Sequence, residues 1–247
     1  MPRLTQVSAA GGSGAAVSLA LTPSTGTPSS VADGAVLDAG MLTGWIVNHP
    51  TGHLASVSDD GAKMEVDYNI NISGDALESG ACLWDNVSFR YPNALQGDFE
   101  AELKVSGDGV SMGSSNAAVA IAIGHRGDAD PDGAVNSVSR GHHTNTAAKV
   151  RYNQGLNASS GAGFYVLDAT SVAWATATWI KIARVDDRIT TYSKTLDGDP
   201  WTELATDSVN LSGREHYLYI MFRGSGVSTA ATFWLYAFKY IGTAAAV

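Results

Sequence analysis

Three carboxylates at alternate positions precede a glycine in the segment GDADPDG, residues 127–133. Asp128, Asp130 and Asp132 have the spacing of the first half of a calcium loop, in which alternate carboxylates converge on a hard cation. The second half does not match, because the position that needs a glutamate is Ser139. These aspartates are the candidate structural calcium site, and an acidic surface turn is the alternative.

Aromatic residues beside polar side chains form a second kind of candidate site. A ring with one exposed face and polar neighbours can stack against a sugar while the neighbours hydrogen-bond its hydroxyls. Burial in the core is the alternative for each of these rings. The candidate glycan-binding residues are Trp84, Asp85, Asn86, Tyr91 and Trp174, all close to expected turns.

Other short patterns carry little functional information. His142 and His143, with His125 nearby, could ligate a metal, but adjacent residues of a strand point to opposite faces. The tripeptide at 126–128 reads RGD, which is too short to predict adhesion. Cys82 is the only cysteine, so it cannot form an intrachain disulfide and is expected to be a small buried residue. The sequence contains no nucleophile-elbow, P-loop or zinc-protease motif.

The charge pattern argues against nucleic acid and membrane partners. The formal net charge is -9, and only 15 lysines and arginines are spread over 247 residues. Nucleic-acid binding and attraction to an anionic membrane both need clustered basic residues. The segment MPRLTQVSAAGG lacks the apolar core of a signal peptide. We therefore expect a protein that is made and kept in a cytoplasm, or assembled there.

Most of the chain from residue 41 onward alternates between apolar and polar residues, which is the pattern of half-buried strands. In DFEAELKVS, the alternation places Phe99, Ala101, Leu103 and Val105 on one face. Turn signals such as SDDG and LDGDP separate the runs, and no long amphipathic helix is evident. Further expected strands lie at 63–73, 117–124, 149–153, 163–168, 217–224 and 231–242. The sequence predicts an all-β sandwich or barrel.

Residues 1–40 differ from the rest in composition. Glycine, serine, alanine, threonine and proline dominate, and Arg3, Asp33 and Asp38 are the only charged residues. This composition predicts a low-complexity arm that docks on a neighbouring subunit, followed by a domain at 41–247.

The stretch from Trp179 to Trp201 predicts three antiparallel strands joined by turns at Asp186-Asp187 and Asp197-Gly198. The patterns WIKIAR, ITTYS and DGDPWT, with GWIV at 44–47 and the closing FWLYAFKYIG, resemble the concanavalin A-like lectin/glucanase superfamily. They are also similar to laminin G-like modules and to a family of jelly-roll modules of unknown function. The resemblance covers roughly residues 41–243.

The resemblance implies a jelly roll of two stacked antiparallel sheets, in which Trp179, Tyr192 and Trp201 are framework residues. Glucanases of the superfamily carry an E-x-D-x-E strand. The nearest match here supplies Glu100 and Glu102 but lacks the central aspartate and the third acid. A charged solvent face explains these glutamates better, so we predict no catalysis. Binding is expected in the long loops at 107–116 and 125–147.

Three functions remain as hypotheses. The first is a virion structural protein, such as a phage capsid decoration, head-fibre or tail protein. It would dock on other copies or on other virion proteins through residues 1–40 and be assembled in the host cytoplasm. The second is a carbohydrate-binding module, which would be extracellular or at a cell surface. The third is a glycoside hydrolase, disfavoured by the missing acids. The expected partners are other copies of this chain, virion proteins or a surface glycan. Neither nucleic acid nor a membrane is expected as a partner, and no obligatory cofactor is expected.

Overall fold

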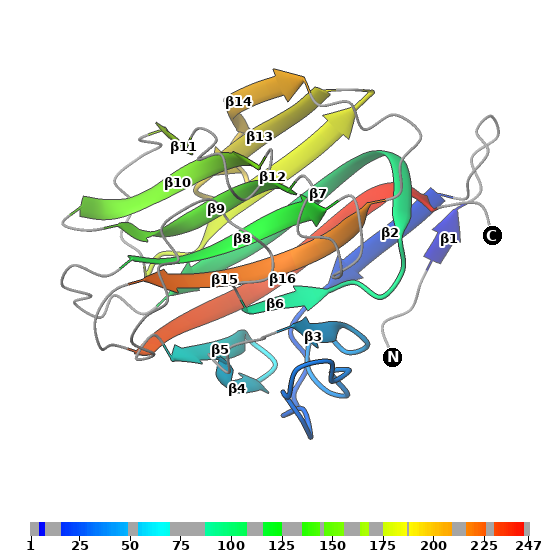
Figure 1. Ribbon diagram of the computed structural model, residues 1–247, viewed down its shortest axis with the longest axis vertical. Helices are drawn as coiled ribbons and strands as arrows, with labels where there is room; N and C mark the ends of the chain where they lie inside the picture. The colour runs from blue at the N-terminus through cyan, green and yellow to red at the C-terminus, as the bar shows by residue number, and fades with distance from the viewer. Residues whose placement is uncertain are drawn as a thin grey trace.

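The chain folds into two antiparallel β-sheets that pack face to face (Figure 1). A computed structural model describes residues 5–7, 16–48, 54–69, 87–107, 116–124, 135–143, 146–155, 164–167, 175–186, 188–208, 216–225 and 230–244. No helix in this part of the chain is long and apolar enough to cross a membrane. The two-sheet antiparallel sandwich predicted from the sequence is confirmed.

The larger sheet has nine strands, ordered β1-β2-β16-β7-β12-β13-β14, with the hairpin β4–β5 attached to β16 through β5. Its strands are β1 (Thr5–Val7), β2 (Ala16–Leu21), β4 (Leu54–Asp59), β5 (Met64–Asn69), β7 (Leu95–Gly107), β12 (Thr178–Val185), β13 (Arg188–Lys194), β14 (Thr202–Ser208) and β16 (Ala230–Ala244). Strand β16 lies at its centre, since β7 pairs with one edge while β5 and then β2 share the other.

The smaller sheet has seven strands, ordered β11-β10-β9-β8-β15-β6-β3. Its strands are β3 (Ile46–Asn48), β6 (Val87–Arg90), β8 (Asn116–Gly124), β9 (Val135–His143), β10 (Thr146–Gly155), β11 (Phe164–Leu167) and β15 (Tyr217–Ser225). Each expected strand from residue 63 onward corresponds to one of these elements or to one in the larger sheet. Residues 70–73, at the end of the first expected run, lie outside the described residues.

The core lies between the sheets and follows the alternation in the sequence. The four apolar residues predicted to face inward on β7, from Phe99 to Val105, are at most 3% exposed. Rings from the two sheets meet in the middle, where the centroid of Phe222 on β15 lies 5.3 Å from that of Phe233 on β16. This removal of apolar surface from water is the main favourable contribution to folding.

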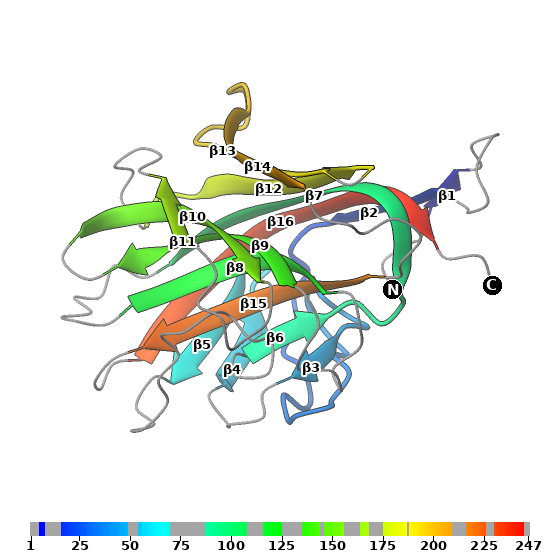
Figure 2. The same cartoon turned by 45° about the horizontal axis from the view of Figure 1, so that its top comes forward.

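The predicted meander is also confirmed. Strands β12, β13 and β14 are consecutive neighbours, and the β12–β13 register runs from Trp179↔Lys194 to Val185↔Arg188. The first turn contains Asp186 with a φ of 54°, a left-handed conformation that aspartate tolerates better than most residues. In Figure 2 the β13–β14 end of the sheet stands above β12, β7 and β16, on the side away from the smaller sheet.

Residues 16–40 belong to the sandwich, which corrects the prediction of an arm at 1–40 separate from a domain at 41–247. Strand β2 pairs with β16, and its alternate side chains Val17, Leu19 and Leu21 are 5–6% exposed within the core. The composition argument failed because a strand needs only a few apolar residues when they alternate and its partner supplies the rest of the sheet. Within residues 1–15 the structure describes only β1, which pairs with β2.

A buried carboxylate joins this N-terminal segment to the sheet. Asp59, at the end of β4, is 5% exposed. Its Oδ2 accepts hydrogen bonds from the backbone N–H groups of Ser24 at 3.0 Å and Met41 at 2.8 Å, and its Oδ1 accepts one from Gly61 at 2.9 Å. The backbones of Asp59 and Gly26 exchange two more hydrogen bonds, both 2.9 Å long. One side chain therefore fixes three separate loop segments.

Replacing Asp59 with alanine should lower the free energy of unfolding by roughly 2–4 kcal/mol, because three backbone N–H groups would lose their acceptor. Equilibrium urea denaturation measures this change. Asp60→Ala is the matched control, since the exposed Asp60 carboxylate accepts N–H groups of Ala62 and Lys63 in the same hairpin, where water can replace it. Equal losses in the two variants would contradict the role assigned to Asp59.

Candidate functional site

Of the predicted glycan-binding residues, only Tyr91 lies within the described part of the chain. Its side chain is 6% exposed and belongs to the core, where its ring packs edge-on against Trp45 at 5.7 Å between centroids. Tyr91 is therefore a core residue, and its prediction as a stacking surface is wrong, because the turn signal after it does not reveal that its side chain points inward. Trp84, Asp85, Asn86 and Trp174 lie outside the described residues.

The candidate calcium residues Asp128, Asp130 and Asp132 also lie outside the described residues, as do Cys82, His125 and the RGD tripeptide. His142 and His143 are consecutive positions at the end of β9, where only the backbone is described. Within the described residues, no three His, Cys, Asp or Glu side chains are grouped so that they could hold a metal ion.

The two glutamates nearest to a glucanase motif lie on the outer face of β7 and are paired with lysines. The carboxylate of Glu100 is 3.6 Å from Lys181 Nζ on β12, and that of Glu102 is 3.6 Å from Lys239 Nζ on β16. Strand β7 pairs with β12 on one side and with β16 on the other, so both lysines come from strands next to the glutamates. Their predicted place on a charged outer face agrees with this geometry.

The same outer face carries the aromatic residues of the meander. Odd-numbered residues of β12 point away from the core, while Ile180 and Ile182 point into it. The register aligns the outward side chains in two rows across the strands. These rows are Lys104–Trp179–Lys194 and Lys239–Glu102–Lys181–Tyr192. The rings therefore pack across strands as framework residues, but on the outside of the sandwich and not in its core.

Lysine ammonium groups lie over each of these rings within the range of a cation–π interaction. The ring centroid of Trp179 lies 5.8 Å from Nζ of Lys104, 5.6 Å from that of Lys194 and 5.0 Å from that of Lys239. The ring of Tyr192 lies 4.5 Å from Nζ of Lys181. The ring of Trp201 lies 4.9 Å from Nζ of Lys181 and 4.7 Å from that of Lys194. Trp179 is 5% exposed, whereas Tyr192 and Trp201 are half-buried. We call these seven residues the aromatic–lysine face.

One aspartate organises the centre of this face. Asp197 Oδ1 accepts hydrogen bonds from Lys104 Nζ at 2.7 Å and from the indole Nε1 of Trp179 at 2.6 Å. Lys194 Nζ donates to the backbone oxygen of Asp197 at 2.9 Å. The hydrogen bonds from Lys104 and Trp179 hold the pKa of the exposed Asp197 carboxyl below its usual value.

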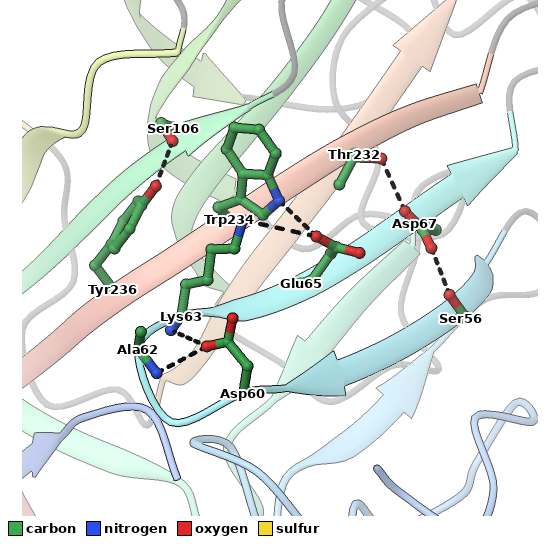
Figure 3. A network of polar contacts seen from close by, with 10 residues as sticks. All are labelled: Ser56, Asp60, Ala62, Lys63, Glu65, Asp67, Ser106, Thr232, Trp234 and Tyr236. Atoms are coloured by element: carbon green, nitrogen blue, oxygen red, sulfur yellow. Dashed lines mark hydrogen bonds and ion pairs between the residues drawn. The ribbon is translucent and has the colours of Figure 1, made fainter. Parts of the chain in front are cut away.

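A second aromatic group lies on the same sheet where β5, β16 and β7 meet (Figure 3). Trp234 donates from Nε1 to Glu65 Oε2 at 2.8 Å, and Lys63 Nζ lies 4.0 Å from the centroid of its ring. A bulge in β16 opposite β7 brings in Tyr236, whose hydroxyl is 3.0 Å from Ser106 Oγ. Both rings are half-buried. We call these five residues the Trp234 cluster.

The distribution of lysine makes this outer surface unusual for an acidic chain. The sequence contains six lysines, and Lys63, Lys104, Lys181, Lys194 and Lys239 all lie on the outer face of the larger sheet, each near an indole or phenol ring. Three of the six tryptophans lie there too. Chemically, the surface offers ring faces and edges, ammonium donors and carboxylate acceptors side by side.

The sequence analysis predicted other residues for binding, although the sequence contains part of the pattern of the aromatic–lysine face. An aromatic residue and a lysine are two positions apart in the pairs Trp179 and Lys181, and Tyr192 and Lys194, so each pair must share a face of its strand. The contact between Glu65 and Trp234 had no such signal, because 169 positions separate the two residues.

The indole N–H of Trp179 should report the titration of Asp197. Since the folded state lowers the pKa of Asp197, the contact is present at neutral pH and is lost as the pH falls through that lowered pKa. We expect the Nε1–H NMR signal of Trp179 to shift with a midpoint below 3.8, the ordinary value. Asp197→Asn should abolish this transition and Asp199→Asn should preserve it. A midpoint at or above the ordinary value would contradict the assignment.

Comparison with known proteins identifies the fold. No protein-family model matches the sequence, and no curated protein matches it. A legume lectin-like domain from Entamoeba histolytica superposes with a TM-score of 0.53 at 10% identity, covering 80% of this chain and 89% of its own. A functionally unknown protein from Saccharomyces cerevisiae superposes with a TM-score of 0.52 at 12% identity, covering 81% of this chain and 97% of its own. An alginate lyase from Pseudomonas aeruginosa gives 0.52 at 10% identity, covering 73% and 84%. The chain therefore shares the antiparallel jelly-roll sandwich fold of these structures.

Proposed function

We propose that this protein is a non-enzymatic carbohydrate-binding jelly roll and that the aromatic–lysine face is its binding surface. One observation carries the proposal: the half-buried rings of Tyr192 and Trp201 lie among ammonium and carboxylate groups on an outward-facing sheet. Such a surface stacks against the apolar face of a sugar and hydrogen-bonds its hydroxyls, as polar groups around an aromatic site do for other ligands.

The composition of the face favours a sugar over a protein partner. Protein–protein interfaces are enriched in aromatic residues and arginine but depleted of lysine and glutamate. This face combines aromatic residues with Lys104, Lys181, Lys194 and Lys239 and with the glutamates of β7. Two structural neighbours, a legume lectin-like domain and an alginate lyase, are compatible with this proposal. At their level of identity they support the fold alone.

The absence of catalysis is part of the proposal. A glycosidase needs two carboxyl groups that flank the scissile bond, one of them as a proton donor. The two outward glutamates of β7, Glu100 and Glu102, each form an ion pair with a lysine of a neighbouring strand. On this strand the carboxylates therefore form ion pairs with lysines.

Trp201→Ala should weaken binding to polysaccharide at least about tenfold, which is the loss typical of a central aromatic contact. Affinity electrophoresis in gels that contain β-1,3-1,4-glucan, laminarin, xylan or alginate measures the effect on each chain type. Val36→Ala, which trims an exposed apolar side chain in another part of the molecule, is the control and should bind like the unchanged protein.

Two results would contradict this proposal. Retention in none of the gels, or retention unaffected by Trp201→Ala, would remove the carbohydrate-binding role of the face. Release of reducing ends from any of these chains, abolished by Glu100→Gln or Glu102→Gln, would remove its non-enzymatic part.

We propose structural assembly as a second role, as in a phage particle component made in a host cytoplasm. The observation that favours it is β1, whose three residues pair with β2 and form the last strand of the larger sheet. An edge strand leaves backbone N–H and C=O groups available to a strand from another chain. This proposal keeps the N-terminal residues as the docking segment but confines them to the part before β2.

Deleting residues 1–7 should reduce an oligomer of this chain to monomers, because β1, the strand proposed to pair with a neighbouring copy, would be lost. Light scattering coupled to size-exclusion chromatography measures the mass. Trp201→Ala, far from that edge in the strand order, should keep the mass of the intact chain. A monomeric intact chain, or an oligomer that survives the deletion, would contradict self-assembly through β1.

A further inference from the structure

Building on the proposed function, we infer that the Trp234 cluster is a second subsite on the same sheet. Together with the aromatic–lysine face, it holds one extended, uncharged polysaccharide chain that crosses β16, β7, β12 and β13. This inference names the class of ligand and the path that it follows, neither of which the fold assigns.

The strand register places the two ring groups on the same face of the sheet. Trp234 pairs with Ser106 on β7, and Lys104, two residues before Ser106, pairs with Trp179 on β12. Trp179 in turn pairs with Lys194 on β13. The β16 bulge places Tyr236 beside Ser106, on the side of Trp234 that faces β7 (Figure 3). The route from Trp234 to β13 therefore passes over the half-buried Lys104 and Lys194, while Ser106 and Trp179 lie beneath it at 0% and 5% exposed.

The length of this route exceeds that of a single sugar unit. Three strand spacings separate β16 from β13, which corresponds to about 14 Å across the sheet. Trp201, beyond Tyr192 by 6.5 Å between centroids, extends the surface further. A single monosaccharide covers only one ring group, whereas a chain that reaches both gains a second binding event at high effective concentration.

The charge balance of the surface favours an uncharged chain. Four of the five lysines have a carboxylate partner: Lys63 with Glu65 at 3.9 Å, Lys104 with Asp197 at 2.7 Å, and Lys181 and Lys239 with the β7 glutamates, both at 3.6 Å. An anionic chain would therefore meet these carboxylates beside every such ammonium group. Sugar hydroxyls both donate and accept, so they can hydrogen-bond to the ammonium group and to the carboxylate of a pair.

The polymer inference is tested with β-1,3-1,4-glucan oligosaccharides from disaccharide to octasaccharide, measured by isothermal titration calorimetry. Affinity of the intact protein should rise with chain length until the chain spans both ring groups. Trp234→Ala should abolish this rise and weaken octasaccharide binding about tenfold, while changing disaccharide binding less than about twofold. Trp201→Ala, in the first group, should weaken binding at every length.

Matched alginate oligosaccharides test the charge class, and they should bind more weakly than the glucan series at each length. Tighter binding of alginate, with a strong dependence on salt, would overturn the uncharged class. A length dependence that survives Trp234→Ala would overturn the second subsite while leaving the proposed function intact. Failure of both series to bind, with retention by none of the polysaccharide gels, would contradict the proposed function itself.

Discussion

Pairing at strand β16 is the constraint on which the rest of the structure depends. This strand takes β7 along one edge and divides its other edge between β5 and β2, so segments from both ends of the described chain meet on it. Its inward residues, among them Phe233 and Tyr240, are fully buried. The pairings of β16 with β2, β5 and β7 join residues that are far apart in the sequence, and such long-range contacts slow folding.

Asp59 complements this pairing at the other end of the β4–β5 hairpin. Backbone N–H groups in the loops after β2 have no sheet partner, and a buried group without a partner is costly. One carboxylate supplies acceptors for Ser24 and Met41 together, and it also fixes the hairpin through Gly61. The polar N-terminal segment thereby becomes part of a core that its composition alone would not predict.

Alternation has opposite consequences on the two faces of the larger sheet. Inward positions of β7 and β12 form a closed apolar core, while the outward positions bring lysines, glutamates and aromatic rings into register. A cation over a ring contributes about 0.5–1 kcal/mol at an exposed site. Several such contacts, with Asp197 between Lys104 and Trp179, order a surface that would otherwise consist of mobile side chains. This order supports the binding role that we propose for the face.

The sequence by itself determined many of the strands from residue 63 onward, their inward faces and the Trp179–Trp201 meander, because period-two alternation and turn residues are local properties. It missed β9, which lies within the segment 125–147 that was expected to be a binding loop. It also showed that Glu100 and Glu102 are not a glucanase triad, because the third acid is missing. Only the tertiary structure decided that residues 16–40 join the sandwich and that Tyr91 points inward. It alone placed Trp234 beside Glu65, 169 positions away. These features depend on which strand edges meet across the chain, and no local pattern contains that information.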